Sequence, residues 1–166
     1  MLSRTALIAL LALPVTLVTH ADEQPSSPPG WLTGADNDQS RFERLEQYLR
    51  GFNQPMWEVG ERYQAVHTAL SRNNFELAGY HWEKIRTTIE NGYMKRPKRK
   101  ANADAILLNT TWAQVRDAFA SRDSRKAWAG FEQARNACMG CHAAESVSFM
   151  NNQPLFELNA PAVKSE

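Results

Sequence analysis

The stretch of sequence that decides the fold reads DSRKAWAGFEQARNACMGCH and occupies positions 123–142. Its apolar residues recur every three or four positions: Ala127, Phe131, Ala134 and Cys138. That spacing is typical of one face of an amphipathic α-helix. Asp123 or Ser124 supplies a polar residue at which such a helix can begin. The stretch therefore predicts a helix with two cysteines and a histidine at its C-terminal end.

The last five residues, Cys138-Met139-Gly140-Cys141-His142, form the pattern by which a protein attaches a haem covalently. The two thiols add to the porphyrin vinyl groups, and the histidine that follows becomes an axial iron ligand. A zinc site needs about four ligands, and the chain has two cysteines in total and no second ligand pair at finger spacing. A redox Cys-x-x-Cys pair would follow a strand, and a plain disulfide would leave His142 without a role. The motif predicts one covalent haem c, bound by Cys138 and Cys141, with His142 as the proximal ligand.

Upstream of this helix the apolar spacing stays helical, and no run of alternating strand character occurs. The expected elements are a lead-in helix capped by Ser40, a helix over 55–71, a helix from Phe75 to Asn91-Gly92, and one that begins near Asn102. Short connections between the last three and the helix from Asp123 favour an all-α, antiparallel four-helix bundle.

The N-terminal residues predict an exported protein. Arg4 precedes the apolar run Thr5–Val18, and the small residues around Ala21 fit a signal-peptidase site. The run is shorter than the ~20 residues that span a bilayer, although an uncleaved anchor is the alternative. We expect a signal peptide at 1–21, a flexible linker at 22–39, a helical haem-binding domain at 40–148 and a C-terminal tail at 149–166. Export to the periplasm agrees with covalent haem attachment, which in bacteria takes place outside the cytoplasm.

Charge excludes one class of partner. Cleavage after Ala21 removes only Arg4 among the charged residues, so Lys and Arg then equal the 18 Asp and Glu. This balance argues against a nucleic-acid partner, and no membrane contact is expected after cleavage. One local cluster stands out, at Lys95, Arg96, Lys98, Arg99 and Lys100. It is either a solvated loop or a group of cations that neutralises haem propionates and attracts an acidic redox partner.

A helical chain with an export signal and Cys138-Met139-Gly140-Cys141-His142 in its last helix resembles the class II cytochromes c, the group that includes cytochrome c prime. The resemblance covers roughly residues 53–148, and the haem motif is its only strict motif. It implies a left-handed four-helix bundle around one haem, with His142 proximal. Members either leave the sixth iron position vacant and bind gases, or fill it with a methionine of the first bundle helix and carry electrons. The lead-in helix and the segment after His142 depart from that pattern.

The sixth iron position decides between the two functions that the resemblance implies. At about 1.5 Å per residue, an antiparallel bundle puts Met56 at the level of His142, and His67 and His81 toward the other end. Met56 lies on the apolar face of its helix, so it is either the distal ligand or an ordinary core methionine. The other candidates near the haem end are Met94 and Met150.

We therefore expect a periplasmic electron carrier with a redox protein as its partner. It is not expected to be an enzyme, because no acid and base pair is predicted near the distal side. The alternative is a five-coordinate haem protein, a sensor or scavenger that binds nitric oxide or carbon monoxide. An accessory subunit that docks through its tail, and a homodimer, also remain open.

Overall fold

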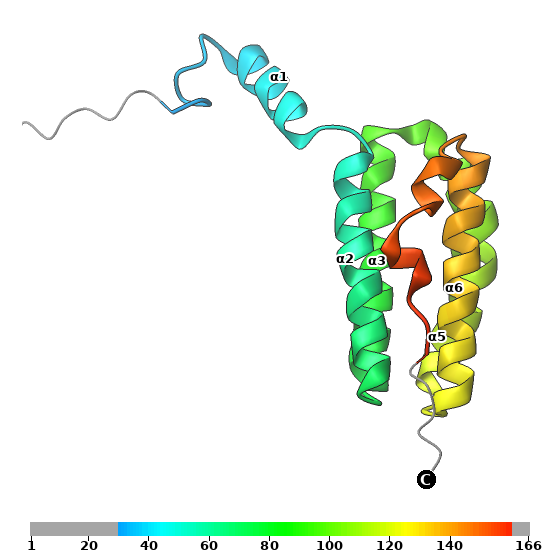
Figure 1. Ribbon diagram of the computed structural model, residues 1–166. Helices are drawn as coiled ribbons and strands as arrows, with labels where there is room; N and C mark the ends of the chain where they lie inside the picture. The colour runs from blue at the N-terminus through cyan, green and yellow to red at the C-terminus, as the bar shows by residue number, and fades with distance from the viewer. Residues whose placement is uncertain (1–29, 161–166) are drawn as a thin grey trace, which may run out of the picture.

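The computed structural model describes residues 30–160, and within this range the chain is all-helical. The predicted signal peptide, the first part of the predicted linker and the last six residues of the tail lie outside the described residues. Four helices lie alongside one another: α2 (Asn53–Ser71), α3 (Phe75–Lys95), α5 (Trp112–Ala120) and α6 (Ser124–Ala144) (Figure 1). Helix α3 packs between α2 and α5, and α6 contacts both α5 and α2. Among the described residues, none of the helices has the length and apolar character needed to cross a membrane.

Helix α1 (Asp38–Leu49) stands away from the other helices, as Figure 1 shows. The predicted cap at Ser40 is wrong, because the Asn37 side chain accepts a hydrogen bond from the Ser40 backbone N–H at 2.8 Å and starts the helix earlier. The helix thus includes the last two residues of the stretch predicted as linker. Its apolar stripe is not buried, since the Phe42 side chain is 62% exposed.

Helix α3 extends beyond its predicted end at Asn91-Gly92 and continues to Lys95. Gly92 is not a helix cap. It lies so close to the Phe52 ring that a Cβ atom there would be 2.6 Å from Cε2 of Phe52. The helix ends instead before Pro97, which disfavours helical backbone at the preceding residue.

The segment between α3 and α5 changes helix type three times. A 3₁₀ turn (η1, Pro97–Arg99) leads into the short α4 (Lys100–Ala103), and a π-helix (η2, Asp104–Thr111) then joins α4 to α5. The Thr110 and Thr111 hydroxyls donate to the Ile106 carbonyl at 2.8 and 3.1 Å. These bonds satisfy a carbonyl in the widened turns of the π-helix. The sequence predicted one helix from about Asn102 and gave no sign of this change.

Aromatic side chains fill much of the core between α2, α3, α5 and α6. The indole rings of Trp82 and Trp112 stack with centroids 4.2 Å apart, and Trp82 Nε1 donates to the Trp112 carbonyl at 3.2 Å. At Gly130, α6 comes so near α5 that a Cβ atom would lie 2.7 Å from Cβ of Ala118. The predicted apolar stripe of α6 is buried here, with Phe131 only 2% exposed.

After α6 the chain reverses at Ser146, which has a φ of 60°. Two 3₁₀ turns follow, η3 (Ser148–Asn151) and η4 (Pro154–Glu157). In Figure 1 this tail descends between α2 and α6. A Cβ atom at Gly60 of α2 would lie 3.4 Å from Leu155 Cδ2, so the tail contacts α2 as well as α6. The tail therefore packs against both α2 and α6.

Candidate haem attachment site

The three residues of the attachment motif lie in the last two turns of α6. Cys138 and Cys141 are both free, half-buried thiols, and His142 stands two residues before the end of the helix. Residues three and four apart project from neighbouring parts of one helical face. The helix thus brings both thiols and the imidazole to the same side of its last turns.

Both thiols are kept neutral by their surroundings. Burial, with a smaller effect of Cys141, raises the pKa of the Cys138 thiol to about 12. Burial also raises the pKa of Cys141, and the Glu145 carboxylate adds to that effect. Removal of a thiol from water disfavours its charged form. At neutral pH the folded chain therefore presents two S–H groups and not thiolates.

The π-helix lies against the part of α6 between Cys138 and Cys141. A Cβ atom at Gly140 would approach Cγ2 of Ile106, a residue of η2, to 3.7 Å. Tyr93 of α3 donates a hydrogen bond to Asp104 Oδ1 at 2.7 Å, and Lys100 pairs with the same carboxylate. The Tyr93 bond connects the start of the π-helix to α3, and the Lys100 pair connects it to α4.

His142 is held by a residue of the tail. Its Nδ1 lies 2.8 Å from Oδ1 of Asn151, and Asn151 Nδ2 donates to the Met139 carbonyl at 3.1 Å. The Phe156 ring meets the His142 ring edge-on, with centroids 5.7 Å apart. Nothing in the sequence pattern pairs Asn151 with His142, so sequence reasoning missed this contact.

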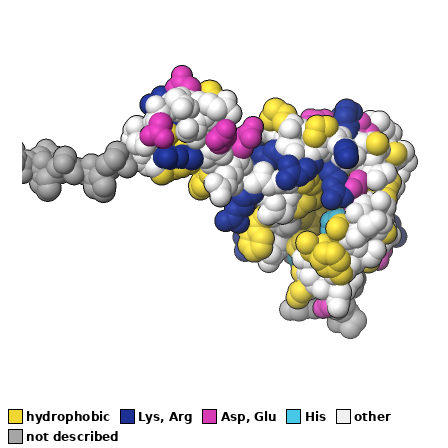
Figure 2. Space-filling model, turned by 90° about the horizontal axis from the view of Figure 1, so that it is seen from above, with side chains coloured by type: hydrophobic (Ala, Val, Ile, Leu, Met, Phe, Trp, Pro, Cys, Tyr) yellow, Lys and Arg dark blue, Asp and Glu magenta, His cyan; other side chains and the backbone are white. Residues whose placement is uncertain are grey.

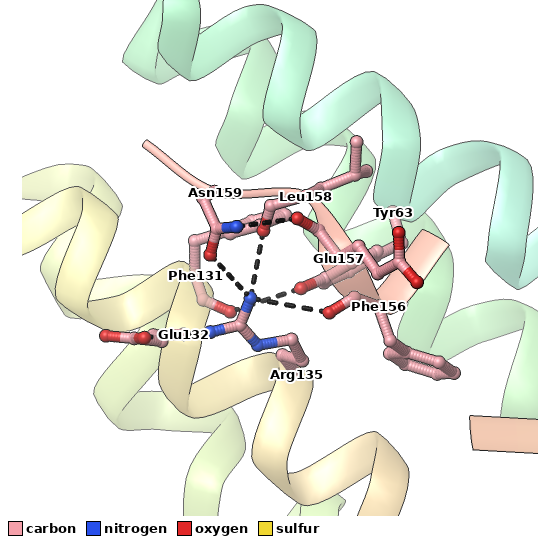
Figure 3. Close-up of polar contacts among 8 residues, drawn as sticks. All are labelled: Tyr63, Phe131, Glu132, Arg135, Phe156, Glu157, Leu158 and Asn159. Atoms are coloured by element: carbon pink, nitrogen blue, oxygen red, sulfur yellow. Dashed lines mark hydrogen bonds and ion pairs between the residues drawn. The ribbon is translucent and has the colours of Figure 1, made fainter. Parts of the chain in front are cut away.

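A second group of contacts fixes the lower part of the tail to α6 (Figure 3). Arg135 Nη1 donates to the Leu158 carbonyl at 2.9 Å and to Asn159 Oδ1 at 3.1 Å. The guanidinium also pairs with Glu132 at 2.8 Å. The Arg135 side chain is only 13% exposed, whereas its partner Glu132 is 64% exposed. Sequence reasoning missed this residue as well.

The structure places Met56 in the first turns of α2, half-buried and packed against the apolar core. In Figure 1 the N-terminal end of α2 and the C-terminal end of α6 lie at the same end of the molecule. Met94 is 80% exposed and Met150 is 46% exposed. Of these three methionines, Met56 is therefore the one that faces the interior at the end where His142 lies.

His67 and His81, the two histidines predicted to lie away from the haem end, have other contacts. His67 Nε2 donates to the Asn159 carbonyl at 2.8 Å, and its ring packs edge-on against Trp128. His81 packs edge-on against Tyr80, and burial lowers the pKa of its imidazole. His67 thus helps to hold the end of the tail.

The predicted basic cluster is partly engaged in contacts within the chain. Arg99 pairs with Glu145 beyond the end of α6, and Lys95 Nζ donates to the Leu49 carbonyl at 2.8 Å. Lys98 is exposed. Figure 2, which views this end of the molecule from above, shows Lys and Arg side chains spread across it among hydrophobic ones.

The donor set fits a c-type haem in its chemistry. Two free thiols, one helical turn apart, precede an imidazole whose Nδ1 is already hydrogen-bonded, and that is the arrangement in which Nε2 serves as a metal ligand. The residues that would hold the group are Cys138, Cys141 and His142, with Met56 as the candidate on the opposite side of the iron. No protein-family model, curated protein or solved structure matches the chain.

Proposed function

We propose that the chain is an exported c-type cytochrome, an antiparallel four-helix bundle with a single haem c. Cys138 and Cys141 hold the haem through thioether bonds, and His142 is the proximal iron ligand. The observation that carries the proposal is the arrangement on the last turns of α6, where two free thiols stand beside an imidazole with its Nδ1 engaged. Each part of that arrangement has a role in haem binding, and a plain helix end would need none of them.

The residues of the chain have separate tasks in this proposal. Each S–H group would add across one vinyl group of the haem. Sulfur would bond to one vinyl carbon and hydrogen to the other, so no atom would be lost. The His142 Nε2 lone pair is available for the iron because Asn151 occupies Nδ1. A bound haem would supply the one-electron chemistry, and the protein would set its potential through the axial ligand and burial.

The function that we propose is electron transfer in the periplasm, without catalysis of a further reaction. Met56 is the proposed distal ligand, since it is half-buried at the end where α6 terminates, whereas Met94 and Met150 are exposed. The partner is a redox protein with an acidic surface, because Lys and Arg side chains gather at this end (Figure 2).

A five-coordinate, gas-binding protein is the second candidate. The same Met56 packs against the apolar core, as a methionine with no metal would. If Met56 stays in the core, the sixth iron position is open to carbon monoxide or nitric oxide. Both candidates share the attachment residues and differ only in what faces the iron opposite His142.

The attachment is tested by expressing the full chain in a periplasm that carries a haem maturation system. We expect the denatured protein to have the mass of residues 22–166 plus one haem, because the signal peptide is removed and thioether bonds survive denaturation. Cys138→Ala combined with Cys141→Ala should give the bare chain mass, whereas Met139→Ala, in the same loop, should keep the haem. A wild-type protein with the bare chain mass would refute the proposal.

The distal side is tested by absorption spectra of the reduced protein with and without carbon monoxide. With Met56 bound, the wild type should be low-spin and bind carbon monoxide slowly, and Met56→Ala should become high-spin and bind it quickly. Met94→Ala is the matched control, since Met94 is 80% exposed. A wild type that is already high-spin selects the gas-binding candidate.

A further inference from the structure

We propose that Asn151 is a positioning residue for His142 that sets the tautomer of the imidazole and thereby lowers the redox potential of the iron. The inference rests on the proposed function, because it concerns the same ligand. It assigns a role to the tail segment 148–160, which the attachment motif does not involve.

The tautomer follows from the two hydrogen bonds of Asn151. The Met139 carbonyl can only accept a hydrogen bond, so the amide group that faces it at 3.1 Å must be the donor Nδ2. The other end of the same amide, Oδ1, can only accept, and it lies 2.8 Å from His142 Nδ1. Nδ1 must therefore carry the hydrogen. The lone pair of the neutral ring is then on Nε2, as an iron ligand requires.

The position of Asn151 is itself fixed by the backbone around it. The Val147 N–H donates to the His142 carbonyl at 2.9 Å, and the Met150 N–H donates to the Val147 carbonyl at 2.9 Å. The reversal at Ser146, with its φ of 60°, brings η3 back over the last turn of α6. Farther along, Arg135 holds the Leu158 carbonyl at 2.9 Å. The backbone is thus held to α6 both before and after Asn151.

This contact has a predictable effect on the iron. A hydrogen bond from Nδ1–H to an acceptor makes Nε2 a stronger electron donor, and outer contacts of this kind tune metal sites. A stronger donor stabilises the ferric form more than the ferrous form. The amide of Asn151 should therefore hold the potential lower than it would be with an apolar residue in its place.

The experiment compares Asn151→Leu, Asn151→Asp and the wild type as full-length, haem-loaded proteins in a spectroelectrochemical titration. Asn151→Leu should raise the potential, because the acceptor is lost. Asn151→Asp should lower it, because a carboxylate accepts the Nδ1–H bond more strongly. Shifts of the redox potential in opposite directions would show that Asn151 tunes the ligand, since a loosened tail would shift the potential of both variants in the same direction. Asn152→Leu, at the exposed neighbouring position, should leave the potential unchanged.

A second measurement keeps the inference falsifiable if a variant fails to fold. In the ¹⁵N-histidine spectrum of the full-length wild type, His142 should carry its hydrogen on Nδ1, with slow exchange against solvent. Hydrogen on Nε2, or equal potentials for both Asn151 variants and the wild type, would overturn the role of Asn151. A wild type without covalent haem would instead refute the proposed function, so the two failures are distinguishable.

Discussion

Replacing Gly130 with alanine tests the tight packing of α6 against α5. The new Cβ atom would lie 2.7 Å from Cβ of Ala118, where an ordinary contact between carbon atoms measures 3.4–4 Å. Helices α5 and α6 must then move apart by about 1 Å, and overpacking of this kind costs about 1–3 kcal/mol. The gain in helix propensity on replacing glycine with alanine offsets about 1 kcal/mol of that cost.

Gly79→Ala is the matched control. Gly79 lies inside α3, and a Cβ atom there meets nothing within 4 Å. The propensity gain of about 1 kcal/mol is common to both variants, so their difference isolates the overpacking cost. Gly79→Ala should stabilise the protein, and Gly130→Ala should be less stable than Gly79→Ala by about 1–3 kcal/mol.

The assay is urea unfolding of the full-length chain followed by far-ultraviolet circular dichroism, with the free energy taken from the midpoint and slope. Combining Gly130→Ala with Ala118→Gly removes the opposing methyl group and should recover part of the loss, which a double-mutant cycle measures. Equal stability of the Gly79→Ala and Gly130→Ala variants would refute the tight packing of α5 on α6.

Three further outcomes follow from the site and its surroundings. Lys98→Gln should slow electron exchange with an acidic partner at low salt, and the difference should shrink as the screening length falls to ~8 Å at physiological ionic strength; equal rates at low salt would exclude steering by this residue. Asp123→Ala removes the cap of α6, whose bond with the Lys126 N–H lowers the pKa of the carboxyl, so the stability difference from the wild type should be full at neutral pH and begin to shrink as the pH falls below ~4 in acid unfolding. In the haem-free chain, iodoacetamide should alkylate Cys138 and Cys141 more slowly in the folded state than in urea, because burial raises the pKa of both thiols; mass spectrometry that finds equal rates would contradict their burial.

The helices that bury one apolar face were predictable from the sequence. Helix α6 begins at Ser124 after the Asp123 cap, as its pattern indicates, and Phe131 and Ala134 on its stripe are buried. Such elements are local, because the spacing of apolar residues and a polar cap together determine them. The same spacing also predicted that Cys138, Cys141 and His142 lie at the C-terminal end of this helix.

Features that depend on which particular side chains meet in the folded chain were not predictable. Gly92 resembles a helix C-cap in the sequence, yet the ring of Phe52 in another part of the chain uses the space left by its missing side chain. In the π-helix, Thr110 and Thr111 both bond to the Ile106 carbonyl, and the spacing of apolar residues does not distinguish a π-helix from an α-helix. Asn151 is one of several asparagines in the chain, and only the reversal of the tail selects it.

The return of the tail along α6 has a consequence for the order of folding. The bonds that hold it span short sequence separations: 9 residues from His142 to Asn151, 12 from Met139 to Asn151, and 24 from Arg135 to Asn159. The bonds from α2 to the same region span 68 residues at Tyr63 and 92 at His67. Because the entropy cost of closing a loop grows with its length, α6 and its tail can assemble before α2 arrives. The segment that carries both thiols and the imidazole would then be shaped early, while the face that α2 later covers is still open.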